Sequence, residues 1–145
     1  MTESGAFAAE PLDVLYALVI ENGKLWGEAA ADFQIRDAEA IFSPDGPKWH
    51  FLTRPRGGSK TSDLAGIALA WLVGEAPEMG RSYIIAGSED QAGELIDAAA
   101  GFLARTPDLK SYAVVEGFSI VAANGASWRG MRVPHCSQHA MLSMT

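Results

Sequence analysis

Apolar residues recur at helical spacing through the first part of the chain. The first such run spans residues 11–22, where a proline opens the run and a glycine follows it. A second helix is predicted over residues 26–42, and the turn sequence SPDGP at residues 43–47 ends it. Residues 1–46 are therefore predicted to be a helical N-terminal segment.

Strand-like and helix-like runs alternate after this segment. Two short apolar runs are each followed by a helical pattern, and two further runs, split by Glu116 and Gly117, have the pattern of a hairpin. The predicted strands are residues 49–53, 83–86, 112–115 and 118–123, and the predicted helices are residues 62–73 and 87–104. This order predicts an α/β fold with a parallel sheet and flanking helices.

The sequence changes character near Ser127. Residues 128–145 carry no sustained periodicity of either kind. We expect them to form an irregular tail, which leaves residues 47–127 as the α/β core.

The composition is that of one soluble globular domain. The chain has 145 residues, of which 48% are hydrophobic, and its one cysteine, Cys136, excludes an internal disulfide framework. No apolar run approaches the ~20 residues of a membrane helix. The acidic N-terminus lacks the basic region of a signal peptide. We therefore expect a cytoplasmic protein with no membrane partner.

The charge is distributed unevenly. The net charge of −7 comes from residues 1–46, which hold nine acids and two bases, whereas residues 47–145 hold nine of each. Four cations lie together in a stretch without acids: Lys48, Arg54, Arg56 and Lys60. Such a cluster can hold a polyanionic ligand, and a solvated basic turn is the alternative.

The sequence RPRGGSKT, at the end of this basic cluster, is similar to a phosphate-binding loop. Lys60 would supply a point charge to the phosphates, and the Thr61 hydroxyl would bind the metal ion. Gly57 and Gly58 would let the backbone turn tightly against the phosphates.

Two positions depart from the pattern G-x-x-x-x-G-K-[ST]. Arg54 replaces the first glycine and Ser59 replaces the second. The predicted strand before the loop and the predicted helix after it supply the context that the motif requires. A structural strand-to-helix turn is the alternative.

The run FLTRPRGGSKTSDLAG resembles the deviant Walker A region of phage terminase large subunits, the DNA-packaging motor ATPases, especially the actinobacterial type. The resemblance implies a P-loop NTPase fold of the ASCE or RecA-like kind. It also implies that Arg56 senses the γ-phosphate and that Gln34, in FQIRDAEAIF, recognises adenine. An exposed polar helix residue is the alternative for Gln34.

The implied ligands are ATP and Mg²⁺, held by Gln34 and by the loop residues Arg56, Gly57, Gly58, Ser59, Lys60 and Thr61. Arg56 and Lys60 would act in catalysis, and Thr61 would hold the metal. In the intact family the partners are double-stranded DNA, the small terminase subunit and the portal protein.

Two parts of such a motor are missing from the sequence. No apolar run after Val121 is followed by Asp-Glu, the pair that holds Mg²⁺ and orients the attacking water, and no nuclease domain follows. We therefore expect an ATP-binding fragment with weak or absent hydrolysis, from a truncated or frameshifted reading frame. The alternatives are an inactive prophage remnant or binding module without nucleotide binding, and a different P-loop enzyme such as a small kinase.

Overall fold

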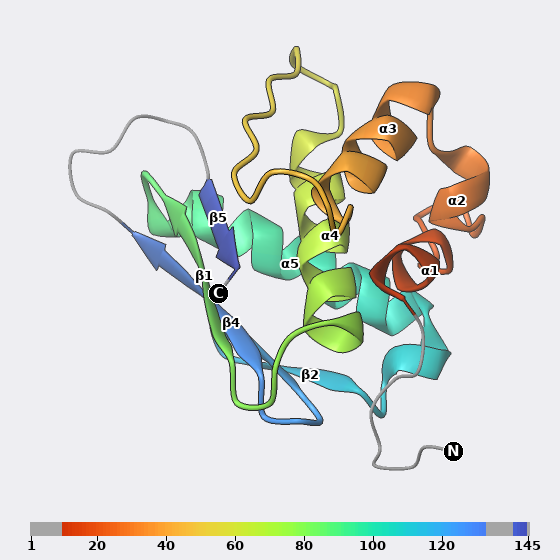
Figure 1. Cartoon of the computed structure of the whole chain (residues 1–145). Coiled ribbons are helices and arrows are strands. Elements are labelled where there is room, and N and C mark those ends of the chain that lie inside the picture. The colour runs from red at the N-terminus through yellow and green to blue at the C-terminus, as the bar shows by residue number, and fades with distance from the viewer. Residues whose placement is uncertain (1–9, 133–140, 145) are drawn as a thin grey trace.

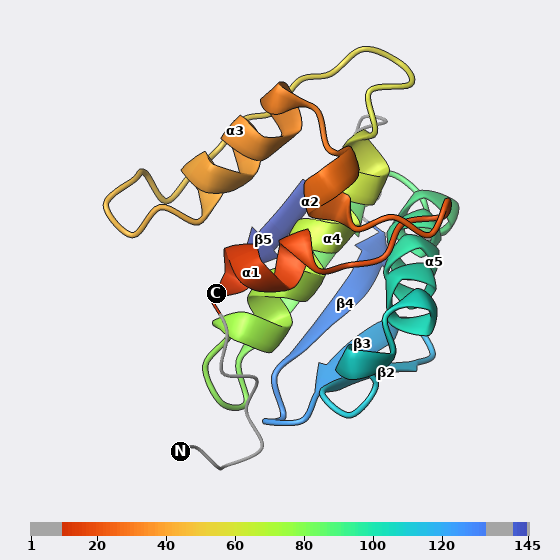
Figure 2. The ribbon, with the colours of Figure 1, turned by 90° about the vertical axis from the view of Figure 1, so that its right-hand side faces the viewer.

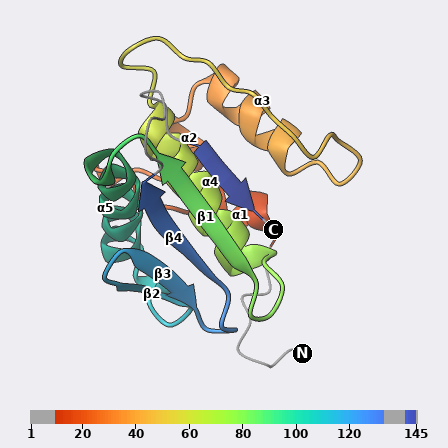
Figure 3. The ribbon, with the colours of Figure 1, turned by 90° about the vertical axis from the view of Figure 1, so that its left-hand side faces the viewer.

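A computed structural model describes residues 10–132 and 141–144 of the chain. Figure 1 shows three layers, with the sheet on one side, the long helices α4 (Lys60–Gly74) and α5 (Glu89–Arg105) against it, and three shorter helices outside them. Over the opposite face of the sheet, turned toward the viewer in Figure 3, no helix of the described residues lies. None of the described helices is long and apolar enough to cross a membrane.

The N-terminal segment is helical, as predicted, but its helices are shorter. They are α1 (Pro11–Tyr16), α2 (Trp26–Ala29) and α3 (Asp32–Ile41). The predicted single helix over residues 26–42 is wrong at its middle, because Ala30 is extended (φ −67°, ψ 140°). The Gln34 side-chain oxygen accepts a hydrogen bond from the Ala31 backbone N–H at 2.7 Å and so caps a new helix there.

The predicted strand at residues 49–53 is not formed. These residues are irregular, and the side chains of Trp49 and Phe51 are each 89% exposed. Their apolar character predicted burial, but a strand also needs a neighbour for its backbone N–H and C=O groups. No strand of the described residues pairs with this segment.

The α/β class is confirmed, whereas a parallel sheet is not. The strands are β1 (Arg81–Ala86), β2 (Ala113–Glu116), β3 (Ser119–Ala122), β4 (Ser127–Arg132) and β5 (Met141–Met144), with a 3₁₀ turn at Pro107–Leu109. They form one sheet in the order β2-β3-β4-β1-β5. Only β1 and β4 are parallel, and the other neighbouring pairs are antiparallel. The predicted hairpin is the β2–β3 pair.

The prediction of an irregular tail is wrong for residues 128–132 and 141–144, which form most of β4 and all of β5. Trp128 and Gly130 are buried while Arg129 and Met131 are exposed, which is the period of two of a strand. The sequence did not predict this strand because Arg129, Gly130 and Arg132 leave few apolar residues in the alternation. The rest of the predicted tail lies outside the described residues.

The N-terminal helices share the core of the α/β layer. Val14, Leu15 and Leu18 are at most 1% exposed and belong to the same buried cluster as Leu69 of α4 and Phe102 of α5. An ideal Cβ on Gly66 would lie 3.1 Å from Leu15 Cδ1. The absence of a side chain at Gly66 therefore lets α1 pack closely against α4.

We therefore predict that Leu15→Ala destabilises the whole chain by about 2–5 kcal/mol, the usual cost of a large-to-small core substitution. Urea unfolding followed by circular dichroism would show one transition at lower denaturant. A separate early transition, with the main one unmoved, would mean that α1 folds independently of the α/β layer.

Candidate functional site

The candidate loop, residues 54–59, lies at the edge of the sheet where the parallel strands end. Helix α4 starts directly after the loop and runs back along the sheet, and β1 returns toward the loop, so its carboxyl end and the start of α4 lie on the same side (Figures 1 and 3). In α/β sheets this is the side on which ligands bind.

Both glycines of the loop are required by its geometry. The Gly58 N–H donates to the Pro55 carbonyl at 3.0 Å, which closes a tight turn, and Gly57 within the turn has a φ of +81°. An ideal Cβ on Gly58 would lie 2.9 Å from the Pro55 oxygen, so any side chain would collide there. Gly57 thus supplies a left-handed conformation, and Gly58 supplies room.

Ser59 is also left-handed, with φ 61° and ψ 24°, and it caps α4 without a side-chain hydrogen bond. A left-handed residue followed by helical residues brings successive N–H groups into a concave arrangement that binds anions. The first N–H groups of a helix also lack partners within the helix. The backbone at Ser59 and the start of α4 could therefore bind an anion.

The predicted ligand residues of the loop face solvent. Arg56, Ser59 and Thr61 are exposed, and Lys60 is half-buried at the first position of α4. No group of three or more His, Cys, Asp or Glu side chains that could hold a metal ion exists among the described residues. A Mg²⁺ ion at Thr61 would thus depend on phosphate oxygens and water for its other ligands.

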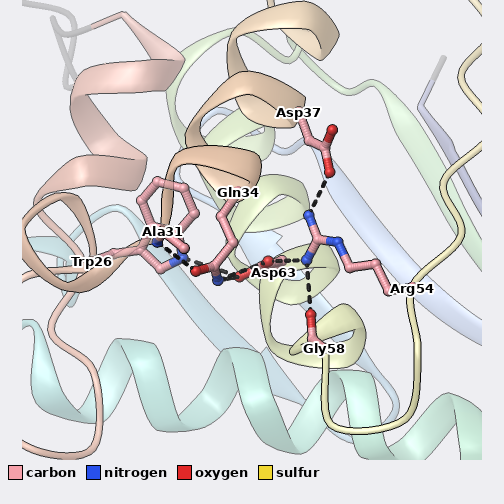
Figure 4. A network of polar contacts seen from close by, with 7 residues as sticks. All are labelled: Trp26, Ala31, Gln34, Asp37, Arg54, Gly58 and Asp63. Atoms are coloured by element: carbon pink, nitrogen blue, oxygen red, sulfur yellow. Dashed lines mark hydrogen bonds and ion pairs between the residues drawn. The ribbon is translucent and has the colours of Figure 1, made fainter.

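A residue without a predicted role, Arg54, forms the polar centre of the site (Figure 4). Its side chain is only 5% exposed, and its guanidinium donates from Nη2 to Asp37 of α3 at 2.7 Å and from Nη1 to Asp63 of α4. Nη1 also donates to the Gly58 carbonyl at 3.2 Å. The guanidinium carbon lies 5.0 Å from the ring centre of Phe33. Arg54 therefore joins α3, the loop and α4.

The pKa of Arg54 lies above its ordinary value. Burial alone would lower that pKa, but hydrogen bonds to Asp37 and Asp63, together with the charges of both carboxylates, more than offset the effect. Arg54 is therefore permanently charged, and its charge is balanced within the protein.

The predicted adenine-binding residue, Gln34, is engaged in the same network. Its Nε2 donates to both carboxylate oxygens of Asp63 at 3.0 Å, and Trp26 Nε1 donates to the same carboxylate at 3.2 Å (Figure 4). With its oxygen on the Ala31 N–H, Gln34 already uses both ends of its amide. Adenine recognition by Gln34 stays a prediction, and it would require Gln34 to exchange partners.

A cavity of about 340 Å³ opens beside this network. Its lining is mixed: the polar and charged residues are Glu21, Asn22, Gln34, Ser59, Ser62, Asp63 and Arg105, and the apolar ones are Ile20, Trp26, Ala29, Ala30 and Phe102. Its volume is near the lower end of ordinary small-molecule pockets. Apolar surface interspersed with hydrogen-bonding groups suits a ligand that carries both, such as a heterocyclic base.

The described residues thus define an α/β domain with a glycine loop and a helix N-terminus at the carboxyl edge of its sheet. No protein-family model matches the sequence, and no curated protein matches it. The fold is similar to that in a crystal structure of the HK97 bacteriophage large terminase, with a TM-score of 0.74 and 21% sequence identity. The alignment covers 90% of this chain and 28% of that chain. The likeness establishes the fold and shows that the chain spans little more than a quarter of that terminase.

Proposed function

We propose that this chain is the ATP-binding part of a motor ATPase of the large terminase kind. The observation that carries the proposal is the position of the loop within a terminase-like fold. The turn made by Gly57 and Gly58 leads into α4 at the ligand-binding edge of the sheet. The terminase-like fold and the sequence of the loop are separate observations, and both support the proposal.

In the proposed complex the phosphates lie on the cradle at Ser59 and the start of α4. Lys60 places its charge on the phosphate chain, Arg56 reaches the γ-phosphate from the exposed tip of the turn, and the Thr61 hydroxyl holds Mg²⁺. The base enters the cavity beside Gln34. Each role uses the residue type that its chemistry requires.

Only nucleotide binding is assigned to this chain. Hydrolysis requires an acid to orient the attacking water, and the sequence has no Asp-Glu pair after an apolar strand beyond Val121. Packaging of double-stranded DNA in the host cytoplasm, with a small terminase subunit and a portal protein as partners, would belong to an assembly that contains more than this chain.

A second candidate, a remnant or binding module without nucleotide binding, is favoured by one observation. The amide of Gln34 is fully engaged by Ala31 and Asp63, so the base would have to compete for it.

Titration with ATP in the presence of Mg²⁺ separates the two candidates. Isothermal calorimetry on the purified chain should show saturable binding of ATP, weaker binding of AMP, and a decline in affinity as salt rises, because the phosphates supply most of the attraction. Absence of ATP binding under conditions where circular dichroism shows a folded chain would remove the proposal and leave the second candidate.

A further inference from the structure

The buried side chain of Arg54 hydrogen-bonds to the loop through the Gly58 carbonyl. We infer that Arg54 is a positioning residue for the phosphate-binding loop, which it orients through the Gly58 carbonyl and shields from the charge of Asp63. The inference rests on the proposed function, and it assigns a role to a residue that stands where the usual motif has a glycine.

The first part of the role concerns one peptide group. Gly58 O accepts a hydrogen bond from Arg54 Nη1 at 3.2 Å. Because a trans peptide is planar, its C=O and the following N–H point in opposite directions. When the Gly58 carbonyl faces Arg54, the Ser59 N–H faces away from Arg54, toward the open side of the loop. Arg54 thereby aims the first donor of the cradle.

The second part concerns charge. Asp63 lies in the first turn of α4, and its side chain is only 4% exposed. An unpaired carboxylate there would repel phosphates at the same helix end. Asp63 instead accepts hydrogen bonds from Arg54, Gln34 and Trp26. Arg54 supplies the only full positive charge among these donors.

The anchor for Arg54 is outside the loop. Asp37 and Phe33, both on α3, hold the guanidinium through an ion pair and a cation–π contact. The loop is therefore positioned by α3 through Arg54. Only arginine fits this task, because two nitrogen atoms of one planar group reach Asp37 and Asp63 at once, whereas a lysine ammonium is a single point.

Arg54→Lys tests the inference, since it keeps a positive charge near Asp63 but cannot make both contacts. We expect ATP to bind at least about tenfold more weakly, the effect of losing a hydrogen bond to a charged group. In ¹⁵N NMR spectra without nucleotide, the Ser59 amide and the Trp26 indole N–H should shift, while the amide of Gly125, in the turn between β3 and β4 beside Met79, should not. Arg36→Lys, an exposed arginine on α3, is the matched control and should change neither.

The outcomes are distinguishable. If the unaltered chain does not bind ATP, the proposed function fails, and the NMR shifts alone decide whether Arg54 orients the loop. Unchanged ATP affinity in Arg54→Lys, or unchanged Ser59 and Trp26 signals, would overturn the inference. If Arg54→Lys does not fold, Asp37→Asn replaces it. That variant weakens the anchor but keeps the contacts to Asp63 and Gly58, so a smaller shift of the Ser59 amide supports the inference and an unmoved signal rejects it.

Discussion

Arg54→Ala is expected to destabilise the fold by about 3–5 kcal/mol, the usual effect of removing one partner from a buried ion pair. The substitution leaves the Asp63 side chain, 4% exposed, without its cationic partner. It also removes the connection between α3 and the loop. Because small domains are stable by only about 5–15 kcal/mol, most of the chain's stability is at risk.

Urea unfolding of Arg54→Ala measures this cost, with Arg36→Ala as the exposed control, which should change stability by less than about 0.5 kcal/mol. The double variant Arg54→Met with Asp63→Asn removes both buried charges but keeps a side-chain oxygen to accept from Gln34 and Trp26, and it should recover part of the loss. An Arg54→Ala variant as stable as Arg36→Ala would show that the buried network contributes nothing to the fold.

The helices and strands that the sequence predicted well have strong local signals. Helix α5 has an N-terminal cap at Ser88, whose hydroxyl accepts a hydrogen bond from the Gln91 N–H, followed by two acids and a regular apolar face. The β2–β3 hairpin has a glycine with φ +61° at its turn. Such signals lie within a few residues of each other, so they can be read without knowledge of the fold.

The errors arose where structure depends on distant partners. Residues 49–53 have strand-like composition, but pairing decides whether a strand forms, and the neighbour of β1 on its open side is β5. Likewise β4 was not predicted, because its alternating pattern is short and the strand is stabilised by parallel pairing with the distant β1. Composition alone carries no information on either pairing.

The candidate site was predicted in its residue types but not in its connections. Arg54 is 17 residues from Asp37 and nine from Asp63, so no local sequence pattern predicts that these three side chains interact. One signal was present: Asp63 directly precedes the apolar run of α4, and a carboxylate that is buried there needs a charged partner. The network also revises the charge of the loop. Of the four clustered cations, Arg54 is paired within the protein, which leaves Arg56 in the loop and Lys60 at the start of α4 to attract an anion.

Lys60→Ala is expected to weaken ATP binding by about 10–100-fold, the effect of losing a charge-assisted hydrogen bond to phosphate. The same substitution should leave the stability of the chain unchanged or raise it by a few tenths of a kcal/mol. Lys60 is the first residue of α4, and a cation at a helix N-terminus is unfavourable because it opposes the helix dipole. Alanine at this position also favours the helix.

The opposite signs of these two effects distinguish a binding residue from a structural one. Calorimetric titration with ATP gives the first effect and thermal unfolding without nucleotide gives the second, with Lys110→Ala, an exposed lysine after α5, as a control that should change neither. A lysine kept for stability would lower both quantities together when removed. A lysine that binds phosphate can lower the stability of the free chain while it strengthens ATP binding. A Lys60→Ala variant with unchanged ATP affinity would contradict that role.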